Sequence, residues 1–259
     1  MARALVTGAG HRLGRAMAIG LATRGFDVAV HYASSDAGAL ETVAEIEKLG
    51  RKGVALQADM LSEAATQELF PKAREALGGD ITCLVNNASI FEYDTIESAT
   101  RDTWDKHHAS NLRAPFVLTQ HMAAQGLKPD VDAQGEPRAT GLIVNMCDQR
   151  VRKLTPEFMT YTLAKMGLWA LTQTSARALS PAIRVNAIGP GPTLQGGRQS
   201  SEHFAKQRAA TIMNRGSNPE DIVGALLYFL DAPAVTGQLL CTDGGQHLAW
   251  ETPDVVGVE

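Results

Sequence analysis

Short apolar runs recur along the chain, and most are followed by a longer stretch in which apolar residues return every three or four positions. The short runs predict buried strands, at residues 3–7, 27–32, 53–57, 81–85, 142–146, 183–188 and 239–242. The longer stretches predict amphipathic helices, at residues 13–21, 37–49, 62–77, 101–125, 157–178 and 219–230. Because strands and helices alternate with short connections, one doubly wound sheet is the simplest solution.

Two segments depart from this pattern. Residues 126–141 are polar and rich in turn residues, which predicts a surface loop. Residues 194–216 are polar and flanked by glycines, which predicts a mobile lid over a substrate. We find no internal repeat and no linker between domains, so residues 1–259 are predicted to form a single domain.

Composition narrows the functional classes. The 259 residues are 44% hydrophobic and 20% charged, which is ordinary for a soluble globular protein. A net charge of −4 gives no electrostatic reason to expect nucleic acid or an anionic membrane as a partner. No apolar run reaches membrane-spanning length, and the first apolar run resembles a strand more than a signal peptide. We therefore expect a soluble, cytoplasmic protein.

The three cysteines are expected to be structural. Cys83, Cys147 and Cys241 are widely spaced, and each falls in a predicted strand or at its end. They form no Cys-x-x-Cys pair or other metal-ligand pattern, so buried, reduced thiols are predicted and no metal site is expected.

A glycine-rich turn joins the first strand to the first helix. The stretch Gly8-Ala9-Gly10-His11-Arg12-Leu13-Gly14 lets the backbone approach a ligand closely, and the helix N-terminus offers free N–H donors. This arrangement suits a pyrophosphate, although a plain strand-to-helix turn is the alternative. With the alternating elements, it predicts an α/β fold: a single Rossmann-like, doubly wound domain with a seven-stranded parallel sheet flanked by helices. The predicted contacts in the turn are Gly8, His11, Arg12, Leu13 and Gly14.

The end of the second strand favours NADP(H) over NAD(H). An NAD-preferring site usually has an acidic residue there, but His31-Tyr32-Ala33-Ser34-Ser35 contains no carboxylate before Asp36. Arg12 and the two serines would bind a 2′-phosphate, unless Arg12 is only a solvated turn residue. After the third strand, Asp59 and Met60 are expected near the adenine, with a turn or helix-capping aspartate as the alternative. The predicted contacts at these two strand ends are His31, Tyr32, Ser34, Ser35, Asp59 and Met60.

The candidate catalytic residues centre on a Tyr-x-x-x-Lys pair. Tyr161 and Lys165 would lie one turn apart on one helix face, and Asp148 ends the fifth predicted strand. A neighbouring ammonium favours the phenolate, by at most roughly 4 kcal/mol at about 4 Å and an effective dielectric of about 20. This spacing alone also occurs in ordinary helices. Asn111, in the middle of a long predicted helix, is expected to hold a water or a neighbouring main chain.

Taken together, these motifs resemble the short-chain dehydrogenase/reductase family over essentially the whole chain. The matching set is Thr-Gly-x-Gly-x-x-x-Gly at residues 7–14, Asn-Asn-Ala at 86–88, Asn111, Tyr161, Lys165, Pro190-Gly191 and Asp243-Gly244-Gly245. The resemblance implies that Asn111, Tyr161 and Lys165 are catalytic. It also implies a homotetramer, with further cofactor contacts from Asn87, Ala88, Ser89, Tyr161, Lys165, Pro190, Gly191 and Thr193.

Two departures from the family pattern are informative. Arg12 stands where a third glycine often lies, and Asp148 replaces the catalytic serine. Both resemble the pteridine reductase branch, which includes the bacterial dihydromonapterin reductases. His31, Tyr32 and Ser35 are similar to that branch's 2′-phosphate site, although Ser34 takes its arginine position. The resemblance implies a substrate site made of Ser89, Phe91, Asp148 and Tyr161.

The chemistry of a pterin explains why an aspartate would replace the serine. Reducing a C=N bond needs a hydride at carbon and a proton at nitrogen, and a carboxyl group can relay protons and bond ring N–H groups. Phe91 would stack on the flat heterocycle, contributing about 1 kcal/mol, unless it is a core or lid aromatic. The alternative for Asp148 is a structural role in the turn that ends the strand.

The sequence therefore predicts an NADPH-dependent reductase of pterin or dihydrofolate-like substrates. Tyr161 would deliver the proton, Lys165 would lower the pKa of Tyr161 and bind the nicotinamide ribose, and Asn111 would hold a water connecting Lys165 to solvent. A carbonyl or 3-oxoacyl-carrier-protein reductase is the alternative of the same class. A non-catalytic NADP(H)-sensing protein is the alternative of another class.

Overall fold

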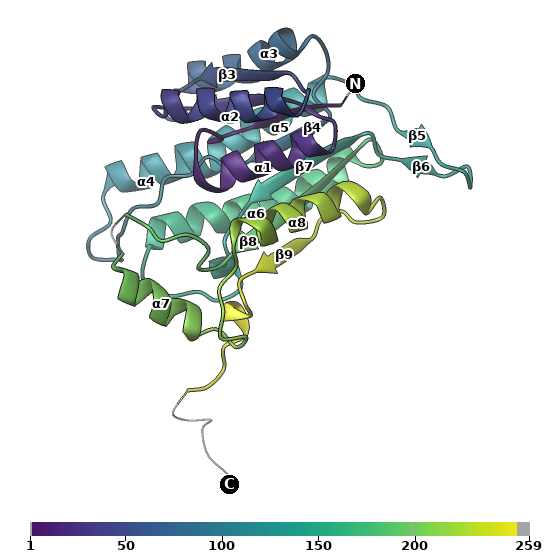
Figure 1. The fold of residues 1–259 in the computed structure, drawn as a ribbon. Coiled ribbons are helices and arrows are strands. Elements are labelled where there is room, and N and C mark those ends of the chain that lie inside the picture. Colours follow the sequence, from purple (N-terminus) through teal and green to yellow (C-terminus); the bar gives the residue numbers. More distant parts are fainter. Residues whose placement is uncertain (1, 198, 253–259) are drawn as a thin grey trace.

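Seven parallel strands form one sheet in the computed structural model, which describes residues 2–197 and 199–252 (Figure 1). Their order across the sheet is β3-β2-β1-β4-β7-β8-β9. The strands are β1 (Arg3–Val6), β2 (Asp27–Tyr32), β3 (Gly53–Gln57), β4 (Cys83–Asn86), β7 (Gly141–Met146), β8 (Ile183–Pro190) and β9 (Leu239–Thr242). The sequence-based prediction of a doubly wound α/β fold is confirmed.

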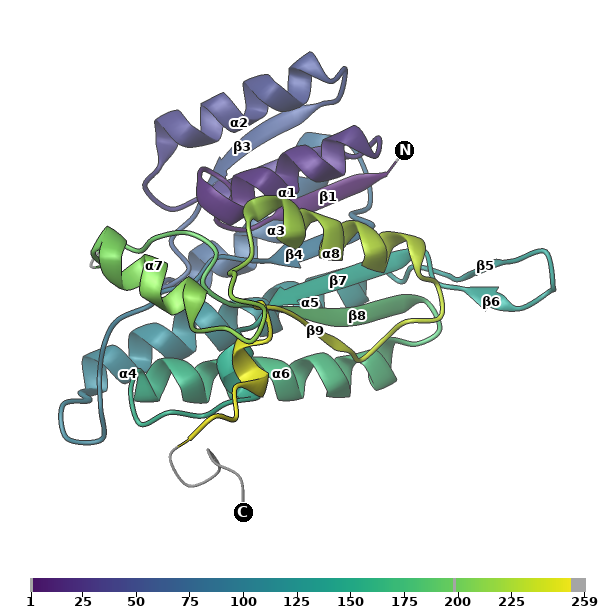
Figure 2. The ribbon, with the colours of Figure 1, turned by 60° about the horizontal axis from the view of Figure 1, so that its bottom comes forward.

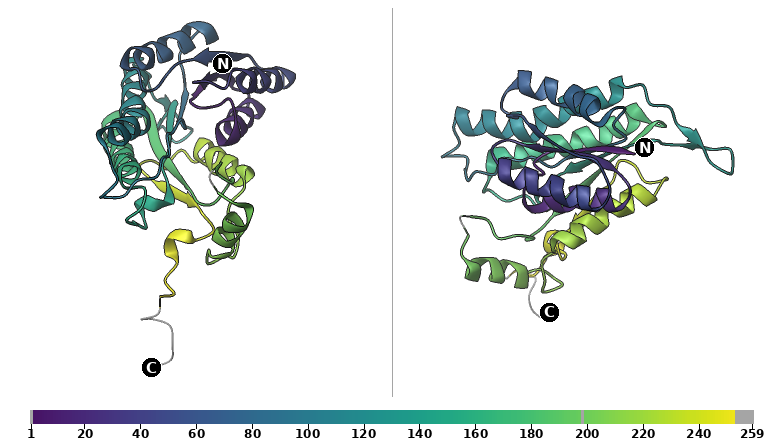
Figure 3. Two further views of the ribbon diagram at one scale, coloured as in Figure 1. Left: turned by 90° about the vertical axis from the view of Figure 1, so that its left-hand side faces the viewer. Right: turned by 45° about the horizontal axis from the view of Figure 1, so that its top comes forward.

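Helices cover both faces of this sheet (Figure 3). One face carries α1 (Arg12–Thr23), α2 (Asp36–Lys48) and α8 (Pro219–Asp231). The other face carries α3 (Glu63–Leu77), α4 (Arg101–His108), α5 (Ala114–Ala124) and α6 (Met159–Leu179). Each layer buries the apolar stripe of its helices, as the periodicity of the sequence predicts.

The side chains of β1 show how one strand supplies both cores. Leu5 packs with Phe70 and Leu118 on the α3 and α5 side, and all three side chains are at most 1% exposed. Its neighbour Val6 packs on the opposite side with Met17 of α1. Burying each of these large side chains stabilises the fold by roughly 1.5–3 kcal/mol. Because side chains on both faces of the central strands are buried, these strands appear in the sequence as continuous apolar runs.

The order of the strands across the sheet reverses at β1, and the candidate site lies at this point of the sheet. β1 pairs with β2 on one side and with β4 on the other, and all three strands run parallel. Their C-terminal ends lie together, with the crossover connections leaving in opposite directions. Ligands of open α/β sheets bind in the crevice at such a point.

The long helix predicted at residues 101–125 is interrupted. It consists of α4, a π-helical turn at Ala109–Arg113 and α5. Such a turn holds one more residue than an α-helical turn, and here it contains the buried Asn111. A periodicity argument cannot detect it, because the apolar spacing on either side is normal.

Both segments predicted to be irregular contain regular structure. The loop at residues 126–141 forms an antiparallel hairpin of β5 (Asp130–Val131) and β6 (Pro137–Arg138), which extends away from the sheet (Figure 2). The predicted lid contains α7 (Ser201–Ala209), where the Ser200 hydroxyl accepts a hydrogen bond from His203 N. No α7 residue is buried, so this helix contributes no side chain to the core. Residue 198 of the predicted lid, like residues 1 and 253–259 of the predicted domain, lies outside the described residues.

Other expectations concern thiols, metals and membranes. Cys83 and Cys147 are buried, Cys241 is half-buried, and all three are free thiols. No group of three or more His, Cys, Asp and Glu side chains suited to a metal ion occurs in residues 2–197 and 199–252. Within the same ranges, each helix falls short of the length and apolar character needed to cross a bilayer.

Candidate active site

Two adjoining cavities open at the C-terminal edge of the sheet. The first has a volume of about 330 Å³ and lies over the ends of β1, β2, β3 and β4. All the cofactor residues predicted from these strand ends line it: Gly8, His11, Arg12, Leu13, Gly14, His31, Tyr32, Ser34, Ser35, Asp59, Met60, Asn87, Ala88 and Ser89.

The second cavity is a cleft of about 580 Å³ beside the predicted lid. Arg12 and Leu13 line both cavities, so the two lie next to each other. Predicted site residues in the wall of the cleft are Phe91, Asp148, Pro190, Gly191 and Thr193. Ser89, predicted for both cofactor and substrate, lines only the first cavity.

The glycine turn is fastened to the end of β4. The Thr7 hydroxyl accepts hydrogen bonds from Asn87 N at 2.8 Å and Ala88 N at 2.9 Å, and the Asn87 amide donates to Thr7 O at 2.8 Å. A Cβ atom at Gly14 would lie 2.1 Å from Gly8 O, so only glycine fits there. Through these hydrogen bonds, the Asn-Asn-Ala segment holds the glycine turn in place.

His31 has a different role from the predicted one. Its ring is 1% exposed, and Nδ1 accepts a hydrogen bond from Gly8 N at 3.0 Å. Nε2 therefore holds the proton and donates to Ala58 O at 3.1 Å. Burial lowers the pKa of His31 from 6.5 to about 4. A neutral ring with both nitrogens engaged supports the turn and has no group left for a 2′-phosphate.

This burial makes the stability of the protein depend on pH. An unfolded His31 takes up a proton below about pH 6.5, whereas the folded one stays neutral down to about 4, so acid favours unfolding in that window. Between about pH 7 and pH 5, wild-type protein should lose about 2 kcal/mol more free energy of unfolding than His31→Asn. The asparagine keeps an acceptor for Gly8 N–H but does not titrate. Urea unfolding at both pH values measures this, and equal losses would refute it.

Arg12 points to the predicted lid. Its backbone has a φ of 52°, an uncommon left-handed conformation for a side-chain-bearing residue. The guanidinium donates to Gln195 O at 2.9 Å and Leu194 O at 3.1 Å. Arg12 is exposed and also contacts the predicted lid, so the 2′-phosphate contact stays a prediction.

The other nucleotide-side polar groups make local contacts. The Asp59 carboxylate accepts a hydrogen bond from Leu61 N at 2.9 Å, which is the turn role that local sequence left open. The Tyr32 hydroxyl donates to Asp36 at 2.9 Å, which raises the pKa of Tyr32. Both residues still line the first cavity, so a cofactor contact is compatible with these roles.

Tyr161 and Asp148 meet directly. The Tyr161 hydroxyl donates to Asp148 Oδ2 at 2.9 Å, and Arg150 N donates to Oδ1 at 2.8 Å. Asp148 therefore faces the phenol and also caps a short 3₁₀-helix at Gln149–Val151. Burial raises the pKa of Asp148. Burial and then the Asp148 charge raise the pKa of Tyr161 well above its usual range.

This direction contradicts the predicted effect of Lys165 on Tyr161. The Lys165 ammonium is 2% exposed, lies 5.6 Å from the centroid of the Tyr161 ring and donates to Met146 O at 2.7 Å. Its own pKa is lowered by burial. The prediction treated the pair in isolation, whereas burial and the nearer carboxylate dominate the phenol and keep its proton in place.

Asn111 holds the main chain, one of the two roles left open for it. Its amide accepts from Ile90 N at 2.9 Å and donates to Ile90 O at 2.8 Å. The residue is fully buried in the π-helical turn. The predicted water contact between Asn111 and Lys165 stays a prediction.

An aromatic pair forms the wall of the cleft above Tyr161. Phe91 stacks on Phe158 with centroids 4.3 Å apart and planes 7° apart, and it meets Tyr161 edge-on at 4.7 Å. The Arg150 guanidinium lies 4.8 Å from the centroid of Phe158, which with Phe91 lines the cleft. Core packing is excluded for Phe91, whose side chain is 45% exposed.

Sequence reasoning missed Phe158 and Arg150. Phe158 has a φ of 55° just before α6 begins. An aromatic residue three positions before Tyr161 was visible in the sequence, but its left-handed conformation was not. Arg150 follows Asp148 by two positions. It lies far from Phe91 in the sequence, so the sequence did not indicate that both residues line the same cleft.

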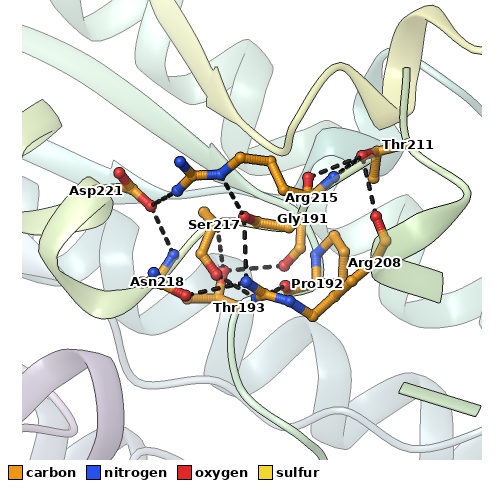
Figure 4. A network of polar contacts seen from close by, with 10 residues as sticks. Gly191, Pro192, Thr193, Arg208, Thr211, Arg215, Ser217, Asn218 and Asp221 are labelled. Atoms are coloured by element: carbon orange, nitrogen blue, oxygen red, sulfur yellow. Dashed lines mark hydrogen bonds and ion pairs between the residues drawn. The ribbon is translucent and has the colours of Figure 1, made fainter. Parts of the chain in front are cut away.

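The lid segment is tied down at its base by Arg208 of α7 (Figure 4). The guanidinium donates to Pro192 O at 2.8 Å, Ser217 O at 2.6 Å and Gly216 O at 3.3 Å, which lie on both sides of α7. Close by, the Thr193 and Ser217 hydroxyls are 2.6 Å apart. The loop that follows β8 is therefore fixed to the start of α8, while Leu194 and Gln195 at the beginning of the segment contact Arg12.

Comparison with known proteins adds independent information. A family model described as enoyl-(acyl carrier protein) reductase matches residues 8–247. A short-chain dehydrogenase/reductase, eriH, from Hericium erinaceus is 34% identical, covering 94% of this chain and 96% of the relative. The 3-oxoacyl-[acyl-carrier-protein] reductase FabG of Staphylococcus epidermidis is 30% identical, covering 95% and 98%.

A solved structure is more similar than these relatives. The crystal structure of FolM alternative dihydrofolate reductase 1 from Brucella suis, in complex with NADP, is 40% identical. The comparison covers 98% of each chain, with a TM-score of 0.90. The whole arrangement of strands and helices, including the segment between β8 and α8, thus has a close counterpart.

Proposed function

Because this chain belongs to the short-chain dehydrogenase/reductase family, we propose that it is an NADPH-dependent reductase of pterin, dihydropterin or dihydrofolate-like substrates. It is an NADP-dependent oxidoreductase of that family. The observation that supports the narrower substrate class is the 2.9 Å hydrogen bond between Tyr161 and Asp148 at a cleft walled by Phe91 and Phe158.

The first cavity fits a dinucleotide. The N-terminus of α1 has no side-chain cap and no acidic residue in its first turn, so its N–H groups suit a pyrophosphate. Arg12, Ser34 and Ser35 line the same cavity, and they are the residues proposed to hold the 2′-phosphate. When bound, NADPH supplies the hydride. We assign Lys165 to the nicotinamide ribose and Pro190, Gly191 and Thr193 to the nicotinamide end.

The protein's own residues supply the proton. The raised pKa of Tyr161 keeps its hydroxyl protonated at neutral pH, so the proton is present before reaction. As the hydride reaches a C=N carbon, the ring nitrogen becomes basic and takes this proton from Tyr161. The Asp148 carboxylate, which lines the cleft, would accept a ring N–H or amino hydrogen and orient the substrate. The stacked phenylalanines would offer a flat surface for the ring.

Turnover measurements test this proposal. Purified protein with NADPH should reduce dihydrobiopterin, dihydromonapterin or dihydrofolate with a higher kcat/KM than a 3-oxoacyl thioester. The consumption of NADPH in steady state measures each rate. If the thioester or a ketone is reduced well and no pterin is reduced, the substrate assignment is wrong and a carbonyl reductase takes its place.

The carbonyl alternative has its own support. The enoyl reductase family model and the FabG relative concern acyl thioesters, and the Tyr161–Lys165 pair suits a ketone equally well. Asp148 in the serine position favours the pterin. A non-catalytic NADP(H) sensor is disfavoured, because Asn111, Tyr161 and Lys165 are all present. The homotetramer remains a proposal that rests on resemblance. The cytoplasmic location and the lid function of residues 194–216 remain proposals that rest on composition and sequence pattern.

A further inference from the structure

A second buried polar network lies beside Tyr161, away from both cavities. It consists of Asp94, His107 and Thr160, which are 1%, 0% and 2% exposed. Asp94 lies in the segment after β4, His107 in α4 and Thr160 in α6. None of the three lines either cavity. Because all three are almost fully buried, we expect any effect on the reaction to pass through their neighbours.

We propose that Asp94, Thr160 and His107 are positioning residues that hold the Phe91–Phe158 pair in place against the Tyr161 hydroxyl. The inference rests on the proposed function of this cleft, because it assigns the network to the placement of a flat substrate ring. Thr160 immediately precedes Tyr161, and Asp94 follows Phe91 by three positions. The network therefore joins the two chain segments that hold the stacking and proton-donating groups.

The hydrogen bonds of the network have a fixed direction. His107 Nε2 accepts from Glu92 N at 3.1 Å, so the ring proton is on Nδ1. Nδ1 then donates to Thr160 Oγ1 at 2.7 Å, and the Thr160 hydroxyl donates to Asp94 Oδ2. Asp94 Oδ1 accepts from Thr160 N at 3.1 Å. A backbone N–H at one end and a carboxylate at the other thus leave only one consistent arrangement of protons.

Asp94 also completes the N-terminus of α6. Phe158, at the cap position, makes no side-chain cap bond. Instead, Met159 N donates to Asp94 O at 3.3 Å and Thr160 N donates to the Asp94 carboxylate. Free N–H groups at a helix start need such partners, and a negative charge is favourable there. The position of the first turn of α6, which contains Tyr161, is thereby set by a residue from another segment.

The segment that contains Phe91 is consequently held at three successive points. Ile90 is bonded through both its N–H and its C=O to Asn111, Glu92 N is bonded to His107, and Asp94 is bonded to α6. His107 also meets the Tyr161 ring edge-on, with centroids 5.9 Å apart. Burial lowers the pKa of His107, which favours the neutral ring that this network needs.

Three variants test the direction of the hydrogen bonds in the network, and not only whether the network exists. Asp94→Asn keeps the shape of the side chain but places an amide N–H against either Thr160 N–H or the Thr160 hydroxyl. The hydrogen bonds of the network cannot reverse direction in response, because Glu92 N–H donates to His107 at the other end of the network. Thr160→Val removes the hydroxyl, and Thr160→Ser restores it. We expect Asp94→Asn and Thr160→Val to lower kcat for dihydrobiopterin about tenfold and to leave the KM for NADPH within about twofold. Thr160→Ser should stay within about threefold of wild type in kcat.

The tautomer of His107 provides a readout that needs no substrate. In ¹⁵N-labelled wild-type protein and in Thr160→Ser, Nδ1 should carry the proton, because Nε2 accepts a hydrogen bond from Glu92 N. A proton on Nε2 in wild-type protein, or equal kcat values for Thr160→Val and Thr160→Ser, would overturn the inference. If wild-type protein reduces no pterin, the substrate proposal fails, while the tautomer still decides whether the network exists.

Discussion

Tyr161→Phe should lose roughly a thousandfold in kcat for pterin reduction while NADPH binds almost as before, because general acid catalysis is typically worth about 10²–10⁴-fold. The change removes only the hydroxyl that donates to Asp148 at 2.9 Å. It keeps the ring that packs against Phe91 and His107. Single-turnover reduction of dihydrobiopterin measures the chemical step, and quenching of protein fluorescence measures NADPH affinity.

The pH profile gives a second check on this role. Because burial and Asp148 raise the pKa of Tyr161 well above its usual range, the phenol stays protonated through neutral and mildly alkaline pH. Wild-type kcat should therefore show no loss as pH rises through this range. A Tyr161→Phe variant that kept most of its single-turnover rate would mean that another group donates the proton.

Asp148→Ser should change substrate preference more than overall activity. We expect kcat/KM for dihydrobiopterin to fall about 100-fold, and that for an unrelated aromatic ketone to change less than about threefold. A serine hydroxyl can polarise a ketone oxygen, but it cannot replace a carboxylate that accepts ring N–H groups. It can also cap Arg150 N, which donates to Asp148 Oδ1 in the wild-type structure.

Asp148→Asn is the matched control, since it keeps the shape and removes the charge. It should lose pterin activity as Asp148→Ser does. The ionised carboxylate is the acceptor, so pterin activity should fall as pH drops through the pKa of Asp148. Burial raises that pKa, so the loss begins at a higher pH than for an ordinary carboxyl group, and it should be absent from Asp148→Ser. Equal losses for pterin and ketone would show that Asp148 does not select the substrate.

Much of the fold and of the nucleotide cavity could be predicted because both depend on local patterns. Apolar runs located the strands, and the glycine turn located the cavity at the end of β1. The direct contact of Tyr161 with Asp148 was also expected, from the resemblance to the pteridine reductase branch. The seven strands agree with prediction to within two residues at every end.

The features that were missed depend on contacts between distant segments. The Arg12 guanidinium meets carbonyl groups more than 180 positions away, and the Asp94 carboxylate caps a helix 66 positions later. His31 was expected to bind the cofactor because of its place at the end of the second strand and the resemblance to a 2′-phosphate site, although its neighbours bury it. A local sequence pattern indicates the periodicity of an element and the residues that cap it. It does not indicate which distant backbone group will form a hydrogen bond with a given side chain.

The π-helical turn at Ala109–Arg113 also fixes the rotational phase of two helices. Each residue advances an α-helix by about 100°. Removing one residue here would join α4 to α5 as a continuous α-helix, but it would rotate one relative to the other by that angle. His107 of α4 could not then face the segment around Phe91 while Leu118 of α5 packs in the core. The length of this turn is therefore as strictly constrained as the identity of the residues that it orients.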